Sequence, residues 1–359
     1  MQIGMFEKQK STDWKWSMKD DYPKEKNGIK VFSLFACGGG STMGYKLAGC
    51  DVLGCNEIDP KMNAIYVANH NPKFNYLEDI RDFNKREDLP EELYNLDILD
   101  SSPPCTSFSM AGDREKCWGV EKKFREGQKS QTLDDLFFIT IETVNKLKPK
   151  VAIFENVEGL TLGNAWSYVQ RIYKELNNIG YKVKHWLLKG ENMGIPQTRH
   201  RVFFIATRLD FDLEKINMSF DYEVIQFKEI KEGICGAVSE KCKQLLDLAT
   251  TKDRNLADIL LRVEGRNSRF NEKIVWDDNL CPTIHNHGSY RGNDKGKFSL
   301  EDYRNGATFP QDYDFVINKA SNAAYIVGMS VPPIMMKRVA ERLIESGIFK
   351  LGEQNGNRC

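Results

Sequence analysis

The chain has 359 residues, and 51 Lys and Arg balance 51 Asp and Glu, so the formal net charge at pH 7 is zero. This length accommodates one large core and a smaller module. The balanced charge lacks the overall signature of a nucleic-acid-binding protein, so any such surface has to be local. No stretch reaches the ~18 apolar residues that span a bilayer, and the N-terminus has no signal-peptide core. The composition therefore predicts a cytoplasmic protein without a membrane partner.

The nine cysteines contain no CxxC pair, which argues against a disulfide framework and against a four-cysteine zinc site. Cys281, His285 and His287 lack a fourth ligand at a suitable spacing, so we expect no metal. Reduced thiols are the simpler interpretation.

An N-terminal arm, residues 1–29, precedes a first buried strand at 29–35, which ends in the glycine run 38–40. Consecutive glycines at a strand-to-helix turn let a ligand approach the backbone closely. A second strand at 51–56 is followed by Glu57, where a Rossmann-type fold holds ribose hydroxyls. The loop has neither the Gly-Lys-Ser/Thr ending of a phosphate loop nor the GxGxxG pattern. The pattern favours a cofactor with ribose and adenine but no pyrophosphate over a βαβ unit without a cofactor.

A third strand is expected at 73–80, with Asp79 at its end, and a fourth at 96–99, which leads through two prolines to Cys105. The prolines stiffen the backbone and present the thiol from a rigid turn at a strand's carboxyl end, where open α/β sheets place their chemistry. A buried structural cysteine is the alternative. The polar segment 113–132 that follows is typical of a lid able to contact a polyanion, with a solvated insertion as the alternative.

A fifth strand at 151–154 is followed at once by Glu155, at the same sheet edge as Cys105. This pairing favours a catalytic acid over a simple helix cap. Arg199 and Arg201 stand two apart on an entering strand, so we expect them to point the same way, toward a phosphate or a carbonyl oxygen.

The regular α/β alternation ends near residue 207, and the irregular segment 208–297 is interpreted as a second, smaller domain. It contains a cluster of Arg and Asn, which are base-reading side chains, although a solvated polar loop is an equal alternative. The predicted domains are the arm, a catalytic and cofactor-binding domain at 30–207, this recognition domain, a segment at 298–350 that returns to the catalytic domain, and a tail at 351–359.

Several stretches together resemble the cytosine-5 DNA methyltransferases of bacteria and their phages, over nearly the whole chain after the arm. Phe35-Ala36-Cys37-Gly38-Gly39-Gly40 is similar to the family's cofactor loop, with Cys37 where glycine is usual. Pro104-Cys105 resembles the nucleophile motif, Glu155-Asn156-Val157 the ENV motif, and Gln197-Thr198-Arg199-His200-Arg201 the QxRxR motif. Residues 280–284 and 309–310 resemble the end of the recognition domain. Residues 328–331 resemble the GNSV motif, with Met329 in place of asparagine.

The resemblance implies a Rossmann-like, S-adenosylmethionine-dependent methyltransferase fold with a smaller target-recognition domain. Phe35 would stack on adenine, Glu57 would hold the ribose hydroxyls, and Asp79 with Ile80 would bind the adenine edge. The full set of implied S-adenosylmethionine contacts is Phe35, Gly38, Gly39, Gly40, Glu57, Ile58, Asp79, Ile80, Pro104 and Ser330.

In this chemistry the Cys105 thiolate adds to C6 of cytosine, which makes the otherwise poorly nucleophilic C5 enamine-like. Glu155, kept protonated in a pocket that raises its pKa, would donate to N3. Arg201 would hold the carbonyl O2, and Arg199 a nearby phosphate or the site's carboxylate. C5 then takes the methyl group, and loss of the C5 proton with release of Cys105 restores the ring. The base has to be flipped out of the duplex for this.

The resulting interpretation is a sequence-specific DNA cytosine-5 methyltransferase. We expect a monomer that acts on double-stranded DNA in a restriction-modification, phage-protection or orphan methylation system, with a cognate restriction endonuclease as a candidate partner. The expected DNA contacts are Arg114, Lys116, Gln197, Arg262, Arg266, Asn267, Arg269 and Thr283. An RNA (tRNA) cytosine-5 methyltransferase on the same scaffold is the alternative, and an inactive DNA-binding regulator is a third interpretation.

Overall fold

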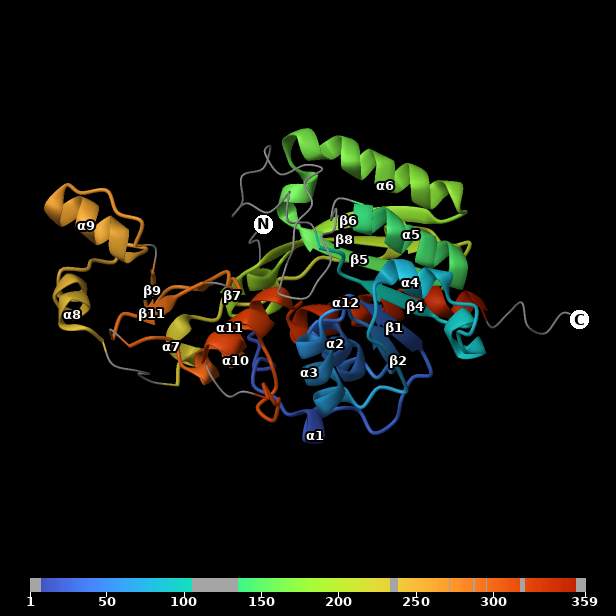
Figure 1. The fold of residues 1–359 in the computed structure, drawn as a ribbon, viewed down its shortest axis with the longest axis horizontal. Coiled ribbons are helices and arrows are strands. Elements are labelled where there is room, and N and C mark those ends of the chain that lie inside the picture. Colours follow the sequence, from blue (N-terminus) through green and yellow to red (C-terminus); the bar gives the residue numbers. More distant parts are fainter. Residues whose placement is uncertain are drawn as a thin grey trace, which may run out of the picture. The chain divides into compact units, whose positions relative to one another are not determined.

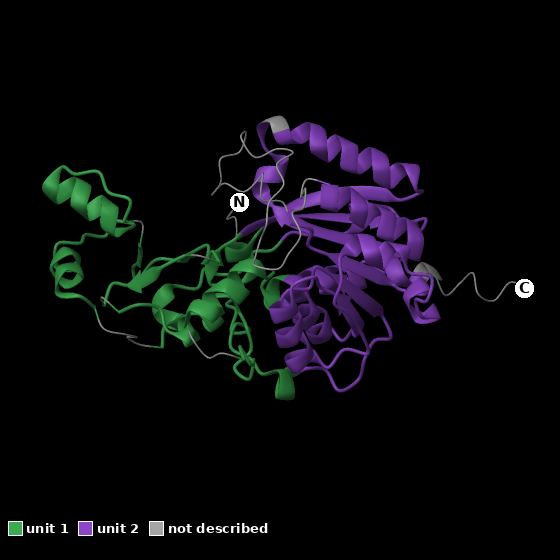
Figure 2. Cartoon of the chain, viewed as in Figure 1, with its two compact units in different colours: residues 1–21, 189–199, 220–335 green, residues 22–188, 200–219, 336–359 purple. Residues whose placement is uncertain are grey.

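The computed structural model (Figure 1) describes residues 8–104, 135–232, 238–270, 272–286, 288–294, 296–316 and 320–352. Cys105, Arg114, Lys116 and His287 lie outside the described residues. The chain divides into two compact units (Figure 2), each assembled from several segments. Unit 1 comprises residues 1–21, 189–199 and 220–335, and unit 2 comprises residues 22–188, 200–219 and 336–359.

The segment boundaries differ from those expected from the sequence. Residues 8–21 of the predicted arm belong to unit 1, where the Trp16 indole is buried and donates from Nε1 to the Thr308 carbonyl oxygen at 2.8 Å. The recognition segment begins at 220 rather than 208, and residues 298–335 stay with it. Aromatic packing explains the second difference, because the ring of Phe298 stacks on that of Phe227 at 4.9 Å.

Unit 2 is built on a seven-stranded sheet with the order β3-β2-β1-β4-β5-β8-β6. The pairs that join β3, β2, β1, β4 and β5 are parallel, and β8 runs antiparallel to β5. The strand order reverses between β1 and β4, the switch point at which open α/β sheets bind ligands. The α/β, Rossmann-like prediction is therefore confirmed. The strands are β1 (Lys30–Leu34), β2 (Asp51–Asn56), β3 (Phe74–Tyr76), β4 (Ile98–Ser101), β5 (Val151–Val157), β6 (Lys182–Lys189) and β8 (His200–Thr207).

Helices cover both faces of this sheet, with α4, α5 and α6 on one face and α2 and α3 on the other (Figure 1). The helix starts follow from local sequence: the Asp59 carboxylate caps α3 by accepting the Lys61 N–H at 2.9 Å, and Pro60 occupies the first turn. The helices of unit 2 are α2 (Gly40–Leu47), α3 (Pro60–His70), α4 (Ile80–Lys85), α5 (Leu136–Leu147), α6 (Trp166–Asn178) and most of α12 (Pro333–Glu345).

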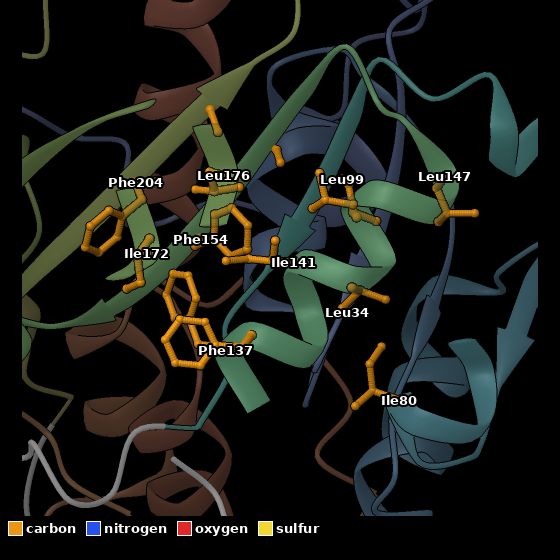
Figure 3. Close-up of a cluster of buried hydrophobic side chains, with 14 of the residues drawn as sticks. Leu34, Ile80, Leu99, Phe137, Ile141, Leu147, Phe154, Ile172, Leu176 and Phe204 are labelled. Atoms are coloured by element: carbon orange, nitrogen blue, oxygen red, sulfur yellow. The ribbon is translucent and has the colours of Figure 1, made fainter. Parts of the chain in front are cut away.

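The main core lies between the sheet and the helices α4, α5 and α6 (Figure 3). The rings of Phe137 on α5 and Phe154 on β5 stack at 4.7 Å. Strand residues alternate between the two faces, so Leu34 and Leu99 enter this core. Their neighbours in sequence point to the opposite face, which α2 and α3 cover.

Unit 1 contains shorter elements. Two-stranded parallel pairs join β7 (Gln197–Thr198) to β10 (Cys281–Pro282) and β9 (Lys273–Val275) to β11 (Tyr290–Gly292). A contiguous stretch from α8 to β9 has its own small core, formed by Leu245, Leu246, Leu256, Ile259, Leu260 and Ile274. The helices are α1 (Met18–Asp21), α7 (Phe227–Ile230), α8 (Glu240–Asp247), α9 (Leu256–Glu264), α10 (Leu300–Gly306) and α11 (Ala320–Met329).

Across the described ranges of both units, no helix combines the length and the hydropathy required to cross a bilayer.

Candidate functional site

The glycine loop, residues 35–40, follows β1 at the switch point and turns sharply. Phe35, Cys37 and Gly39 have φ values of 55°, 48° and 84°, so alternate residues are left-handed. A Cβ on Gly39 would lie 2.0 Å from Nε2 of the buried His70 ring, which is itself 3.2 Å from the Gly38 carbonyl oxygen. Burial lowers the pKa of His70 to about 3, so the ring is neutral and donates from Nε2. The loop backbone therefore rests directly on an imidazole.

Glu57 directly follows β2 and binds the glycine loop. Its Oε2 accepts the Cys37 N–H at 2.7 Å, and its Oε1 accepts the Asp59 N–H at 2.8 Å. Burial raises the pKa of this carboxyl group, against the lowering effect of the backbone donors. Each oxygen keeps acceptor capacity for a further donor. Glu57 thus stands where the sequence predicts it, held rigidly at the carboxyl end of β2.

The residues expected to flank a bound adenine lie beyond β2 and β3. The predicted third strand ends early, at Tyr76, so Asp79 lies in the turn before α4 and caps that helix by accepting the Arg81 N–H at 2.8 Å. Ile80 is buried in the main core, whereas Ile58 is only partly buried.

Asn156 connects β5 to the turn that precedes Cys105. Strands β4 and β5 run parallel, with Ser101 opposite Phe154, so both end at the same edge. The Asn156 Nδ2 donates to the Pro103 carbonyl oxygen at 3.2 Å. Sequence reasoning assigned this residue no role, although its position in the ENV motif was a signal.

Glu155 and Arg201 form the principal ion pair of this edge. The β5 strand extends to Val157, so Glu155 lies within the strand rather than after it. Arg201 is its diagonal neighbour on antiparallel β8, and Arg201 Nε lies 2.7 Å from Glu155 Oε1 with both side chains nearly buried. The guanidinium of Arg201 is thus the immediate partner of the carboxyl group that the sequence predicts as the catalytic acid.

Arg199 does not share a target with Arg201. Its Nη1 donates to the Ile284 carbonyl oxygen at 3.3 Å, and its Nη2 donates to those of Gly328 and Ser330 at 3.2 and 2.6 Å. Arg199 is 2% exposed and belongs to unit 1, whereas Arg201 belongs to unit 2. The physical reason is a break in the chain's course, because β7 ends at Thr198 and β8 begins at His200. The structure thus places Arg199 on three backbone carbonyl groups of unit 1 and does not bring it together with Arg201 on one target.

Gln197 and Thr283, which the sequence predicts as DNA contacts, both make hydrogen bonds within unit 1. Gln197 is fully buried; its Nε2 donates to the Gly306 carbonyl oxygen at 2.6 Å and its Oε1 accepts the Ile284 N–H at 3.2 Å. The Thr283 hydroxyl donates to the Thr198 carbonyl oxygen. Both polar atoms of the Gln197 side-chain amide therefore form hydrogen bonds within unit 1.

The GNSV-like segment at the end of α11 is held by the same part of unit 1. The Ser330 hydroxyl donates to the Ile326 carbonyl oxygen at 2.8 Å. At the substituted position, the Met329 sulfur lies 3.3 Å from Asn286 Nδ2. A Cβ on Gly328 would approach the Asn286 backbone nitrogen to 2.3 Å, so only glycine fits there.

The predicted base-reading cluster lies at the end of α9. Arg262 forms a two-point pair with Asp253, from Nε at 3.2 Å and Nη2 at 2.7 Å, so its guanidinium is engaged within the module. Arg266 is exposed beside Glu264, and Asn267 and Arg269 are exposed. A cavity of about 460 Å³ opens beside the start of α9, lined by Lys252, Arg254, Asn255, Asp258, Leu261 and Arg262.

Within the described ranges, no group of three or more His, Cys, Asp or Glu side chains is arranged to hold a metal ion.

Comparison with known proteins links this geometry to one family. Residues 29–305 match the family of C-5 cytosine-specific DNA methylases. The type II methyltransferase M.NgoPII of Neisseria gonorrhoeae is 34% identical over 198 residues, which are 55% of this chain and 53% of that protein. M.Sau96I of Staphylococcus aureus is 25% identical over 350 residues, which are 89% of this chain and 77% of that protein. The chain spans about half the length of M.NgoPII and several other curated relatives it matches.

A solved structure shows the same fold. An E. coli prophage-encoded protein, described as a DNA modification methyltransferase, superposes with a TM-score of 0.65 at 16% identity and covers 89% of this chain and 99% of its own. The resemblance stated from the sequence motifs is confirmed. Because the family match extends over more than half of the chain, the protein belongs to the C-5 cytosine-specific DNA methylases.

Proposed function

We propose that this protein is a sequence-specific DNA cytosine-5 methyltransferase that uses S-adenosylmethionine and acts as a monomer on duplex DNA. The observation that carries the proposal is the Glu155–Arg201 pair, 2.7 Å apart at the sheet edge where Asn156 holds the Pro103 carbonyl. Cys105 follows two residues after Pro103. An ordered carboxylate, on a strand that ends at the same edge as the strand leading in sequence to Cys105, and its guanidinium partner match what cytosine methylation requires.

The described residues fit S-adenosylmethionine. Gly39 has a left-handed backbone and no room for a Cβ beside the His70 ring, so glycine is required for the sharp turn of this loop. Glu57, fixed by the N–H groups of Cys37 and Asp59, keeps lone pairs for ribose hydroxyls. Phe35 is partly buried against the main core and supplies an apolar face for adenine. When bound, the cofactor supplies an electrophilic methyl group carried on a sulfonium.

Residues of the chain supply the nucleophile and the hydrogen-bonding groups for the cytosine ring. The Cys105 thiolate forms a bond to C6 and breaks it again once the C5 proton has been lost. Arg201 keeps guanidinium donors beyond the one given to Glu155, and these suit the cytosine O2. Glu155, paired with Arg201, has two roles open to it at the cytosine ring. Its carboxylate can accept a hydrogen bond from the amino group, or it can take up a proton and donate it in a hydrogen bond to N3.

Unit 1 is proposed to bind the duplex. Its exposed candidates are Arg266, Asn267 and Arg269, together with Lys252 and Arg254 at the cavity beside α9. Arg and Asn read base edges, and Lys and Arg neutralise phosphates. Arg114 and Lys116, outside the described residues, are proposed to contact the DNA around the flipped base. The type II names of the relatives favour a cognate restriction endonuclease as a partner.

Methyl transfer from labelled S-adenosylmethionine to duplex DNA and to tRNA tests the proposal. We expect incorporation into duplex DNA, and bisulfite sequencing of DNA from expressing cells then identifies the base and its context. The Cys105→Ala variant is expected to lose at least ~1000-fold in rate, because the covalent step is removed, while it still binds the cofactor. Equal turnover by Cys105→Ala, or methylation of tRNA alone, would reject the proposal.

A further inference from the structure

Asp100 is a buried carboxyl group for which the proposed reaction has no direct use. It lies on β4, five residues before Cys105 in sequence, and is 1% exposed. On β4, Leu99 enters the main core, so Asp100 faces the opposite side of the sheet, toward α2. A carboxyl group at such a position is costly unless its contacts compensate for the lost hydration.

The contacts of Asp100 reach two elements that form the cofactor side of the site. The Ser33 hydroxyl on β1 donates to Oδ2 at 2.6 Å, and the Tyr45 hydroxyl on α2 donates to Oδ1 at 3.1 Å. Ser41, in the first turn of α2, is also within hydrogen-bonding reach. Ser33 lies two residues before Phe35, and α2 begins at the last glycine of the loop. One carboxyl group therefore joins the strand before the glycine loop, the helix after it, and the strand that leads to the nucleophile.

The Asp100 carboxyl group is also close to Glu155 on the neighbouring strand β5. In the parallel register Asp100 is opposite Ile153, which places it one diagonal step from Glu155 on the same face of the sheet. Burial raises the pKa of Asp100 to about 7; the Ser33 and Tyr45 hydroxyls oppose this rise, and the Glu155 charge adds to it. The partners supplied by the described residues are hydroxyl groups. Such a site is retained at an energetic cost, which is typical of a functional rather than a purely structural position.

We propose that Asp100 is a positioning residue that holds α2, and with it the glycine loop, in register with the strand leading to Cys105. This inference rests on the proposed function, because it assigns the loop to the methyl donor and Cys105 to the base. Loss of the carboxyl group lets α2 and the loop move relative to β4. Misplacement of reacting groups by a fraction of an ångström to 1 Å is enough to lower both cofactor affinity and rate.

Asp97, which directly precedes β4, provides a matched control. It is also a nearly buried carboxylate; it accepts the Lys30 N–H at 2.8 Å and pairs with Lys150 Nζ at 2.7 Å. These contacts lie at the other end of β4, away from the glycine loop. The Asp97→Ala variant therefore removes a comparable structural contact without releasing α2.

The experiment measures S-adenosylmethionine binding by calorimetry and backbone hydrogen exchange of residues 38–47 for the wild type, Asp100→Ala, Asp100→Asn and Asp97→Ala. We expect Asp100→Ala to weaken binding about tenfold and to accelerate exchange in α2. Asn keeps an acceptor for Tyr45 and can donate to Ser33, so Asp100→Asn is expected to stay within about threefold of the wild type. Asp97→Ala is expected to lose thermal stability with unchanged exchange in α2.

Each outcome decides a different claim. Exchange in α2 that is the same in Asp100→Ala and the wild type overturns the inference, as does an equal loss of binding in Asp97→Ala. An Asn variant as defective as the Ala variant also overturns it, since charge rather than attachment would then matter. If the wild type binds no S-adenosylmethionine, the proposed function fails, and the exchange data still decide whether Asp100 holds the helix.

Discussion

At the scale of single residues, the glycine loop depends on positions where the backbone conformation and the available space restrict which residue fits. Gly39 combines a left-handed backbone with contact to the His70 ring, while Cys37, also left-handed, donates its N–H to Glu57. A backbone N–H is present whatever the side chain, so this hydrogen bond is kept with cysteine at a position where glycine is usual.

The Gly39→Ala substitution is expected to destabilise the protein by about 3 kcal/mol or more, because a Cβ would overlap the buried imidazole as well as strain the backbone. Urea unfolding measures this change. Gly180→Ala is the control, since Gly180 has a similar φ of 88° but nothing within 4 Å of its Cβ position. It should cost only about 1 kcal/mol. Equal losses in the two variants would contradict the role of His70.

The buried Asp100 also predicts a pH dependence of stability. Its pKa is about 7 in the folded protein and about 3.9 when unfolded. Between these values the folded state keeps a proton that the unfolded state has lost, so stability is highest at low pH and falls as pH rises toward 7. Relative to Asp100→Asn, the wild-type free energy of unfolding should fall by up to about 4 kcal/mol across this window. Urea titrations measure the free energy of unfolding of both proteins from pH 4.5 to pH 8. The same pH dependence in the wild type and Asp100→Asn would exclude a contribution from Asp100.

At the scale of secondary-structure elements, the sequence predicts positions that depend on parallel strands and misses those that depend on contacts distant in sequence. Glu57 and Glu155 follow short buried runs, and parallel strands end at one edge, so their placement is local. Arg199 does not point the same way as Arg201, because the chain leaves β7 before Arg199 and enters β8 after it. Its carbonyl partners lie 85 to 131 residues away in sequence, and no local periodicity encodes them.

Buried Gln197 on β7 and exposed Arg266 after α9 can be compared to test which residues contact DNA. Gln197→Ala should lower the free energy of unfolding by about 2 kcal/mol, since it leaves buried backbone groups without partners. Arg266→Ala should leave stability within about 0.5 kcal/mol of the wild type and weaken DNA binding. Thermal unfolding and fluorescence anisotropy separate the two effects. A stable Gln197→Ala protein with selectively weaker DNA binding would instead support a direct DNA contact of Gln197.

At the scale of the whole molecule, charge is balanced and DNA attraction has to come from local groups. We therefore expect a shallow salt dependence for duplex binding, with a log–log slope of about −2 to −5 between 50 and 200 mM salt. Removal of one phosphate-contacting cation, tested at Lys252 or Arg254, should reduce the slope by about 1. The Lys241→Ala variant, outside the cavity lining, serves as the comparison. A steep slope near −10 that is unchanged in the Lys252 and Arg254 variants would contradict DNA attraction by these local cations.

Chain connectivity has a consequence for how such proteins diversify. Unit 1 is assembled from three separate stretches of sequence, so a single genetic exchange cannot replace it. The stretch from α8 to β9, in contrast, is continuous and folds around its own leucine- and isoleucine-rich interior. Recombination confined to that part of the gene can import a new surface for the proposed DNA contacts while the glycine loop and the Glu155–Arg201 pair are inherited intact. Chimeras exchanged there should keep the parental melting temperature, and those with breakpoints inside β7 should not.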